Sequence, residues 1–226
     1  MSSPTPPTAS SAQVSSTKEA NDRQPIPTSH VVIFVTLAVV GCVLDLASKS
    51  FVFSRLGNVL VMEYARPPVW LWEGVFGFET HVNEGALFGM GQGQVRLFAT
   101  LSVIAFIGVL YWLFIARAAA DRLLTFSLGC ITAGIFGNLY DRVGLHGLTW
   151  QQEYGNHEIG DRVFAVRDWI HFKIDAIGFD WPLFNIADSF LVVGACLLAW
   201  HAFFGPHPNS SSSSDGAATT SDQLEN

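Results

Sequence analysis

Two aspartates stand at apolar stretches of the chain, where a carboxylate is costly. Asp188 lies in the first turns of the apolar run 184–204, with Asn185 three residues earlier on the same face, and Asp168 lies in VRDWIHF. A carboxylate in a membrane helix must face protein or water and have a partner. If two such acids share a poorly solvated site, one holds a proton and the other can activate a water molecule. Two aspartates alone are weak evidence, because membrane carboxylates also relay protons or pair with arginine.

An acid and a base also fall within the first long apolar run, at about 30–53. Asp45 and Lys49 are four residues apart and therefore share one face of a helix, with the acid on the N-terminal side in the favourable order. We expect an intramembrane salt bridge with a structural role. Direct participation in chemistry is the alternative.

The segment AGIFGNLYDR combines small and polar residues. One helical face carries Gly134, Gly137, Asn138 and Asp141. Ala133 and Gly137 form a pair of small residues four positions apart, which predicts the close approach of another helix. The polar residues predict a site, although an aspartate at this position can also simply mark the water boundary.

The composition is that of a membrane protein. Of the 226 residues, 50% are hydrophobic and 14% are charged, and the mean hydropathy is +0.34. The formal net charge of -7 argues against a nucleic-acid partner, because binding phosphates requires clustered lysine and arginine. The histidines show no metal-ligand spacing and GMGQG matches no cofactor-binding loop, so we expect neither a metal nor a cofactor.

Four apolar runs predict a membrane fold that is mainly α. A small β-rich platform is expected between the first two helices, where residues 54–94 alternate apolar and polar positions. Both ends of the chain have compositions typical of disordered tails, at 1–28 and 205–226, and they flank one membrane domain at 29–204. The four helices are expected at about 30–53, 95–116, 123–140 and 184–204.

Four spans place both tails on one side of the membrane and the two long loops on the other. Four lysines and arginines lie on the tail side, against seven on the loop side. Taken literally, the positive-inside rule would place the loops in the cytoplasm. We give this count little weight because the loops are long and part of their charge can be paired or functional.

Five motifs stand in order along the predicted domain. They are DLASK in the first helix, NEGALFG before the second, GNLYDR at the end of the third, VRDWI, and PLFNIADS at the start of the fourth. Together they resemble the lipoprotein signal peptidases, or signal peptidase II, of aspartic peptidase family A8. The resemblance covers about residues 31–204 and leaves out only the tails.

The resemblance implies an aspartic endopeptidase of the bacterial cytoplasmic membrane. Such enzymes cut prolipoproteins on the amino side of a diacylglyceryl-modified cysteine, so the implied partners are this substrate and membrane lipid, and we expect a monomer. It also implies cytoplasmic tails, a platform outside the cytoplasm and a catalytic pair near the outer face. By position the pair is Asp168 and Asp188, and the substrate-binding or supporting residues are Asn83, Asn138, Arg142, Asn185, Asp141, Asp45 and Lys49.

One stretch departs from the family pattern. The family typically has only a handful of residues between the GNxxDR motif and the catalytic aspartate that follows, whereas residues 145–165 are inserted here. This insertion contains a competing acid, Asp161. We choose Asp168 because the WIHF after it and its spacing to PLFNIAD fit the pattern. The insertion is predicted to be either a lid over the pair or a passive surface loop.

Two other classes of protein fit parts of the sequence. A small proton-coupled transporter also places Asp and Asn inside helices, but the four spans show no internal repeat and the acids gather near one face. A membrane scaffold tolerates small-residue packing, but it has no use for the polar faces of the third and fourth helices.

Overall fold

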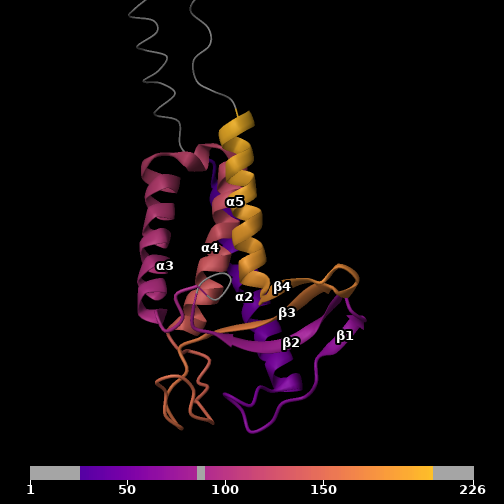
Figure 1. Ribbon diagram of the computed structural model, residues 1–226. Helices are drawn as coiled ribbons and strands as arrows, with labels where there is room; N and C mark the ends of the chain where they lie inside the picture. Colours follow the sequence, from indigo (N-terminus) through magenta and orange to yellow (C-terminus); the bar gives the residue numbers. More distant parts are fainter. Residues whose placement is uncertain (1–25, 86–89, 206–226) are drawn as a thin grey trace, which may run out of the picture.

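The computed structural model describes residues 26–85 and 90–205. The disorder predicted for the two tails therefore falls almost wholly outside the described residues, as does the end of NEGALFG. Four helices are long and apolar enough to cross a membrane, which confirms the predicted class (Figure 1). They are α2 (Thr28–Leu56), α3 (Val95–Leu110, continued by a π-helical turn at Tyr111–Ile115), α4 (Arg122–Arg142) and α5 (Ile186–Phe204).

Helix α4 is the centre of the bundle. It is the most buried of the four spans and packs against α2, α3 and α5, whereas α3 stands apart from α5 (Figure 1). Small residues permit this packing. A Cβ added at Gly41 of α2 would lie 2.6 Å from the Cβ of Ala133, and one added at Gly194 of α5 would lie 2.8 Å from the carbonyl oxygen of Ser127. The predicted close approach is confirmed, with Ala133 facing α2 and Gly134 facing the backbone of α5 at Ala187.

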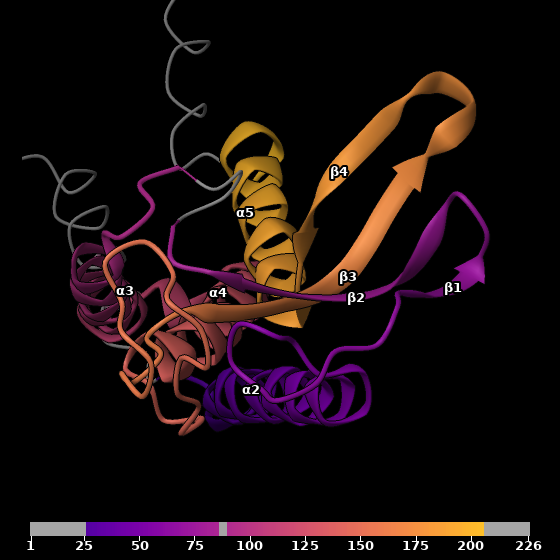
Figure 2. The same ribbon diagram turned by 60° about the horizontal axis from the view of Figure 1, so that its bottom comes forward.

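An antiparallel sheet adjoins one end of the bundle. Its strands are β1 (Val69–Trp72), β2 (Phe76–Asn83), β3 (Val166–Ile174) and β4 (Phe179–Phe184), in that order. The expected platform between α2 and α3 thus supplies only β1 and β2, and the segment between α4 and α5 completes the sheet. The far ends of both hairpins extend away from the helices (Figure 2).

The inserted stretch 145–165 forms part of a packed core. Trp150, Val163 and Ala165 are fully buried, and they cluster with residues from the end of α2, including Phe53, and with Trp169 of β3. Burying a large aromatic ring contributes strongly to stability. The insertion is therefore anchored to the domain at both of its ends, and its role as a lid or as a passive loop stays a prediction.

Candidate active site

Asp168 lies on β3, and its side chain is shielded from solvent. The residue is 2% exposed. Its Oδ1 accepts a hydrogen bond from Nδ2 of Asn185 at 2.6 Å, and its Oδ2 accepts one from Nδ2 of Asn83 at 3.1 Å. Burial and the negative charge of Asp188 raise the pKa of Asp168 to about 8, although the two amide hydrogen bonds favour its ionised form. Asp168 therefore holds a proton at neutral pH.

Asp188 lies in the first turn of α5, where local sequence fixes its position. Asn185 caps the helix: its Oδ1 accepts from the backbone N–H of Asp188 at 3.0 Å, and Oδ2 of Asp188 accepts from the backbone N–H of Asn185 at 3.2 Å. This reciprocal capping box starts the helix at Ile186, two residues after the approximate start expected at 184. The N-terminus of a helix favours negative charge, and it does so here at Asp188.

Two asparagines join the two acids. Nδ2 of Asn138, on α4, donates to Oδ1 of Asp188 at 2.8 Å. Oδ1 of Asn138 accepts from Nδ2 of Asn185 at 3.2 Å, and that same amide donates to Asp168. Four elements thus converge on a set of polar side chains that we name the dyad cluster: Asp168, Asp188, Asn83, Asn138 and Asn185.

A second set of buried polar residues lies beside the first. Nζ of Lys49 is 2.7 Å from Oδ2 of Asp45, which confirms the predicted intramembrane salt bridge, and 3.3 Å from Oδ2 of Asp141. Asp141 also accepts from Arg167, at 3.1 Å from Nε, 2.8 Å from Nη2 and 3.0 Å from the backbone N–H. We name Asp45, Lys49, Asp141 and Arg167 the ionic cluster.

The ionic cluster holds the dyad cluster in place. Asp141 binds Arg167, the residue directly before Asp168, by both side chain and backbone. Oδ1 of Asp45 accepts from the backbone N–H of Ala187, directly before Asp188, at 2.9 Å. Lys49 donates to Oδ1 of Asn138 at 3.0 Å. The supporting roles expected for the acids of α2 and α4 therefore have a geometric basis.

Sequence reasoning missed Arg167, counting it only as a loop charge. The available signal was its place in VRDWI, where a cation within an apolar run needs a buried partner. Arg142 lies at the edge of the site: Nη2 donates to the carbonyl oxygen of Gly85 at 3.3 Å, and the guanidinium lies 5.6 Å from the ring centre of Phe98. It is within electrostatic range of both Asp168 and Asp188.

Asp161, the competing acid, is placed differently. It is exposed, and its Oδ2 accepts from the backbone N–H of Glu158 at 3.0 Å. The geometry therefore favours Asp168 as the partner of Asp188. Within residues 26–85 and 90–205, no three His, Cys, Asp or Glu side chains are grouped as metal ligands would be.

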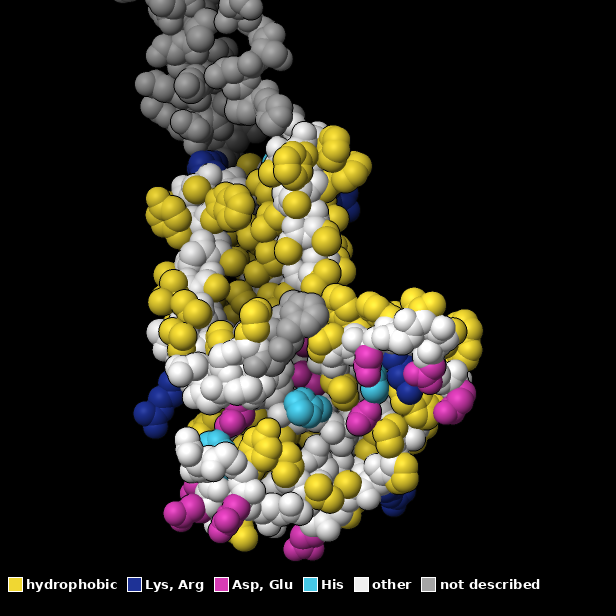
Figure 3. Space-filling view, viewed as in Figure 1, with side chains coloured by type: hydrophobic (Ala, Val, Ile, Leu, Met, Phe, Trp, Pro, Cys, Tyr) yellow, Lys and Arg dark blue, Asp and Glu magenta, His cyan; other side chains and the backbone are white. Residues whose placement is uncertain are grey.

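The space-filling view places these acids relative to the hydrophobic spans. A hollow runs between α3 and α5 with hydrophobic side chains along its floor, and acidic side chains are visible at its foot (Figure 3). Below this level the surface becomes polar, with acidic and histidine side chains among the hydrophobic ones (Figure 3). The site therefore lies where the apolar bundle meets the polar end of the molecule.

Comparisons with known proteins agree on one family. A family model described as signal peptidase (SPase) II matches residues 37–204. A lipoprotein signal peptidase of Rhodopirellula baltica is 43% identical over 180 residues, covering 78% of this chain and 74% of that protein. One of Geobacillus thermodenitrificans is 33% identical over 181 residues, covering 79% and 94%. A bacterial membrane enzyme structure determined by the in meso method at 2.3 Å resolution has a TM-score of 0.60 at 23% identity over 82% of this chain and 94% of that chain, so the folds are alike.

Proposed function

The chain belongs to the signal peptidase II family, and on that premise we propose that it removes signal peptides from diacylglyceryl-modified prolipoproteins with Asp168 and Asp188 as its catalytic pair. It is a bacterial membrane protein of an aspartic peptidase family. The observation that carries the catalytic assignment is the dyad cluster itself. Two acids from different elements share one site in which their direct partners are amides and backbone N–H groups.

The surroundings of the two acids assign them different roles. Asp188, at the positive end of α5, is placed to take the proton from the attacking water. Asp168, whose raised pKa keeps it protonated at neutral pH, donates to the oxygen of the scissile carbonyl. Proton transfer to and from the substrate then needs only this pair, whose titration belongs to both acids together.

The asparagines and the ionic cluster maintain this geometry. Asn185 contacts both acids, because its side-chain amide donates to Asp168 and its Oδ1 accepts from the backbone of Asp188. Asn138 is oriented in turn by Lys49. Holding reacting groups in fixed positions removes much of the entropic cost of the reaction.

The hydrophobic hollow between α3 and α5 supports a lateral path for the substrate (Figure 3). A signal peptide and the diacylglyceryl chains both reside in lipid, and acyl chains remain there because each buried methylene contributes about 0.8 kcal/mol. A substrate entering the hollow from the membrane would meet the dyad cluster at its foot. We place the tails in the cytoplasm and the dyad near the outer face, as the family resemblance implies.

Cleavage of a synthetic diacylglyceryl prolipoprotein by the purified protein in lipid tests both parts of the proposal. Asp168→Asn and Asp188→Asn should each lower kcat by about four orders of magnitude or more, because each removes a proton-transfer group. The matched control is Asp175→Asn, since Asp175 is an exposed acid whose partner is Lys173 at 3.1 Å. It should cleave like the parent.

A folding readout must accompany these assays. Thermal unfolding in detergent should show that both dyad variants remain folded. A fully active Asp168→Asn variant would sink the dyad assignment, and loss of activity in Asp161→Asn alone would transfer the role to that acid. A parent protein that cleaves no diacylglyceryl prolipoprotein would contradict the function itself.

A further inference from the structure

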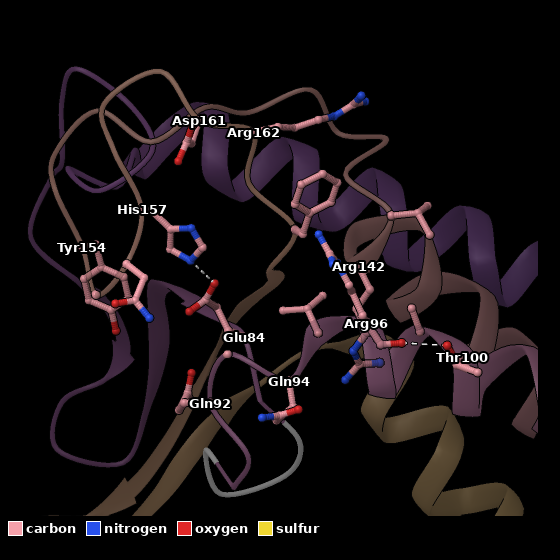
Figure 4. A pocket seen from close by; sticks show the side chains of 17 residues that line it. Glu84, Gln92, Gln94, Arg96, Thr100, Arg142, Tyr154, His157, Asp161 and Arg162 are labelled. Atoms are coloured by element: carbon pink, nitrogen blue, oxygen red, sulfur yellow. Dashed lines mark hydrogen bonds and ion pairs between the residues drawn. The ribbon is translucent and has the colours of Figure 1, made fainter.

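A solvent-open cavity of about 1300 Å³ lies on the polar side of the dyad cluster. Its walls come from the insertion, the end of β2, the first turns of α3 and the end of α4 (Figure 4). Neither the catalytic proposal nor the lateral path uses this space.

The wall formed by the insertion is held firmly in place. The imidazole of His157 stacks on the buried ring of Trp150, with centroids 4.8 Å apart and planes at 8°. Nε2 of His157 lies 2.6 Å from Oε1 of Glu84, across the cavity from the insertion to the strand side (Figure 4). A buried anchor and a contact to β2 thus fix the shape of the cavity.

One side chain on the cavity wall contacts the dyad cluster: Nε2 of Gln92 donates to Oδ1 of Asn83 at 3.3 Å. Glu84 directly follows Asn83, whose amide donates to Asp168. Arg142, on the opposite side, lies both in the wall of the cavity and within electrostatic range of the two catalytic acids. The cavity therefore adjoins the dyad cluster on its polar side.

Three arginines and two acids face the cavity, so its charge is slightly positive. Arg142 donates to the carbonyl oxygen of Gly85, and Arg162 donates to that of Gly144 at 2.8 and 3.0 Å. His157 faces one of the acids, Glu84. The guanidinium of Arg96 is exposed and makes no side-chain hydrogen bond or ion pair with the described residues, which leaves it available to a ligand.

We propose that this cavity binds the first residues of the mature lipoprotein, on the carboxyl side of the modified cysteine, and prefers an acidic side chain there through Arg96. The inference rests on the proposed function. The signal peptide and acyl chains occupy lipid, so the chain after the cysteine must leave the dyad cluster toward water, where the cavity lies. The amide side chains of Gln92, Gln94 and Asn156 on its walls suit a peptide backbone.

Substrate competition tests the preference. Three diacylglyceryl prolipoprotein peptides would carry Asp, Asn or Lys at the second residue after the cysteine and be identical elsewhere. The parent in lipid nanodiscs at low salt should cleave the Asp peptide with a kcat/KM about twofold to fivefold above that of the Asn peptide, as expected for an exposed charge pair, and the Lys peptide more slowly still. Raising the salt should shrink the ratio.

In the Arg96→Gln variant, the kcat/KM for the Asp peptide should fall close to the kcat/KM for the Asn peptide. The variant should still cleave the Asn peptide. Arg66→Gln is the matched control, because Arg66 is exposed on the loop before β1 and does not line the cavity. It should keep the parental ratio. Equal cleavage of all three peptides by the parent, or the same loss of preference in Arg66→Gln, overturns the site while leaving the peptidase function intact. Absence of any cleavage by the parent would count against the function itself.

Discussion

The ionic cluster and the dyad cluster lie side by side, yet they balance charge in different ways. In the ionic cluster each carboxylate contacts a cation: Asp45 contacts Lys49, and Asp141 contacts both Lys49 and Arg167. In the dyad cluster neither Asp168 nor Asp188 makes an ion pair with any residue in the described part of the chain. Their partners there are amides and backbone N–H groups.

This difference distinguishes charged residues that stabilise the fold from acids that can exchange a proton with a substrate. A fully paired cluster has no reason to exchange protons, and its opposite charges stabilise one another inside a medium of low polarity. Two acids without a contacting cation can reduce their repulsion by sharing a proton, which is the state needed for acid–base catalysis. Asn138 links the two clusters, since it accepts from Lys49 and donates to Asp188.

The largest effect on stability is expected from breaking the ionic cluster at its lysine. Lys49→Met leaves Asp45 buried without a cation, and removing one partner of a buried ion pair costs about 3–5 kcal/mol. Lys173→Met is the control, because Lys173 pairs with the exposed Asp175 and such surface pairs contribute about 1 kcal/mol or less. Unfolding in detergent, followed by temperature or denaturant, compares the two. Equal losses would remove the distinction between the clusters.

The next effect is expected on activity, which should depend on pH. Because the pKa of Asp168 is raised to about 8, this acid loses its proton as the pH rises through that value. Above it kcat should fall about tenfold per pH unit, since the proton donor is then lost. Rates measured from pH 6 to 10 check this, and Asp175→Asn should follow the parental curve. A flat profile up to pH 10 would show that Asp168 does not supply the proton.

A smaller loss of stability is expected from a steric clash at Gly137, which lies between Asp45 of the ionic cluster and the start of α5. A Cβ at Gly137 would lie 2.9 Å from the Cβ of Ala187 and would overlap the carboxylate of Asp45, so Gly137→Ala should cost about 2 kcal/mol. At Gly108 of α3 an added Cβ meets nothing within 4 Å of described structure, so Gly108→Ala is the control. Thermal unfolding should separate them. A Gly137→Ala protein as stable as the Gly108→Ala protein would mean that α5 and Asp45 can shift without penalty.

Much of this arrangement was predictable from the sequence, because membrane spans and buried charges leave strong signals. Length and apolarity located the four helices, and the four-residue spacing of Asp45 and Lys49 predicted their salt bridge. The ordered motifs selected Asp168 and Asp188, which the fold brings into one site through Asn138 and Asn185.

The strands β3 and β4 escaped prediction for a physical reason. The first residues of β3 are buried on both faces, so VRDW lacks the alternation that marks a half-exposed strand, and only the five residues IHFKI after it alternate. The pairing of Arg167 with Asp141 escaped for a related reason. This ion pair joins α4 to β3, which lies beyond the insertion in the sequence. Sequence separation alone does not predict which acid a given arginine will pair with.

The dependence of stability on pH provides the sharpest contrast between the clusters, because its sign is opposite. The folded-state pKa of Asp168 lies above the ordinary aspartate value of 3.8, so between about pH 4 and 8 the folded protein binds more protons than the unfolded chain. Stability contributed by this acid is therefore present at low pH, falls through that window and levels off above it. Asp168→Asn removes the titrating group while keeping most of the side-chain shape.

Relative to the parent, Asp168→Asn should gain about 1 kcal/mol of stability for each pH unit as the pH rises from 5 to 8, whereas Lys49→Met loses stability relative to the parent. Paired unfolding curves at several pH values measure this, with Asp175→Asn as the control that should track the parent. If Asp168→Asn instead lost stability as the pH rose, the carboxylate of Asp168 would be stabilising the fold as the acids of the ionic cluster do. The dyad cluster would then be a second structural network, and its lack of a contacting cation would no longer indicate a shared proton.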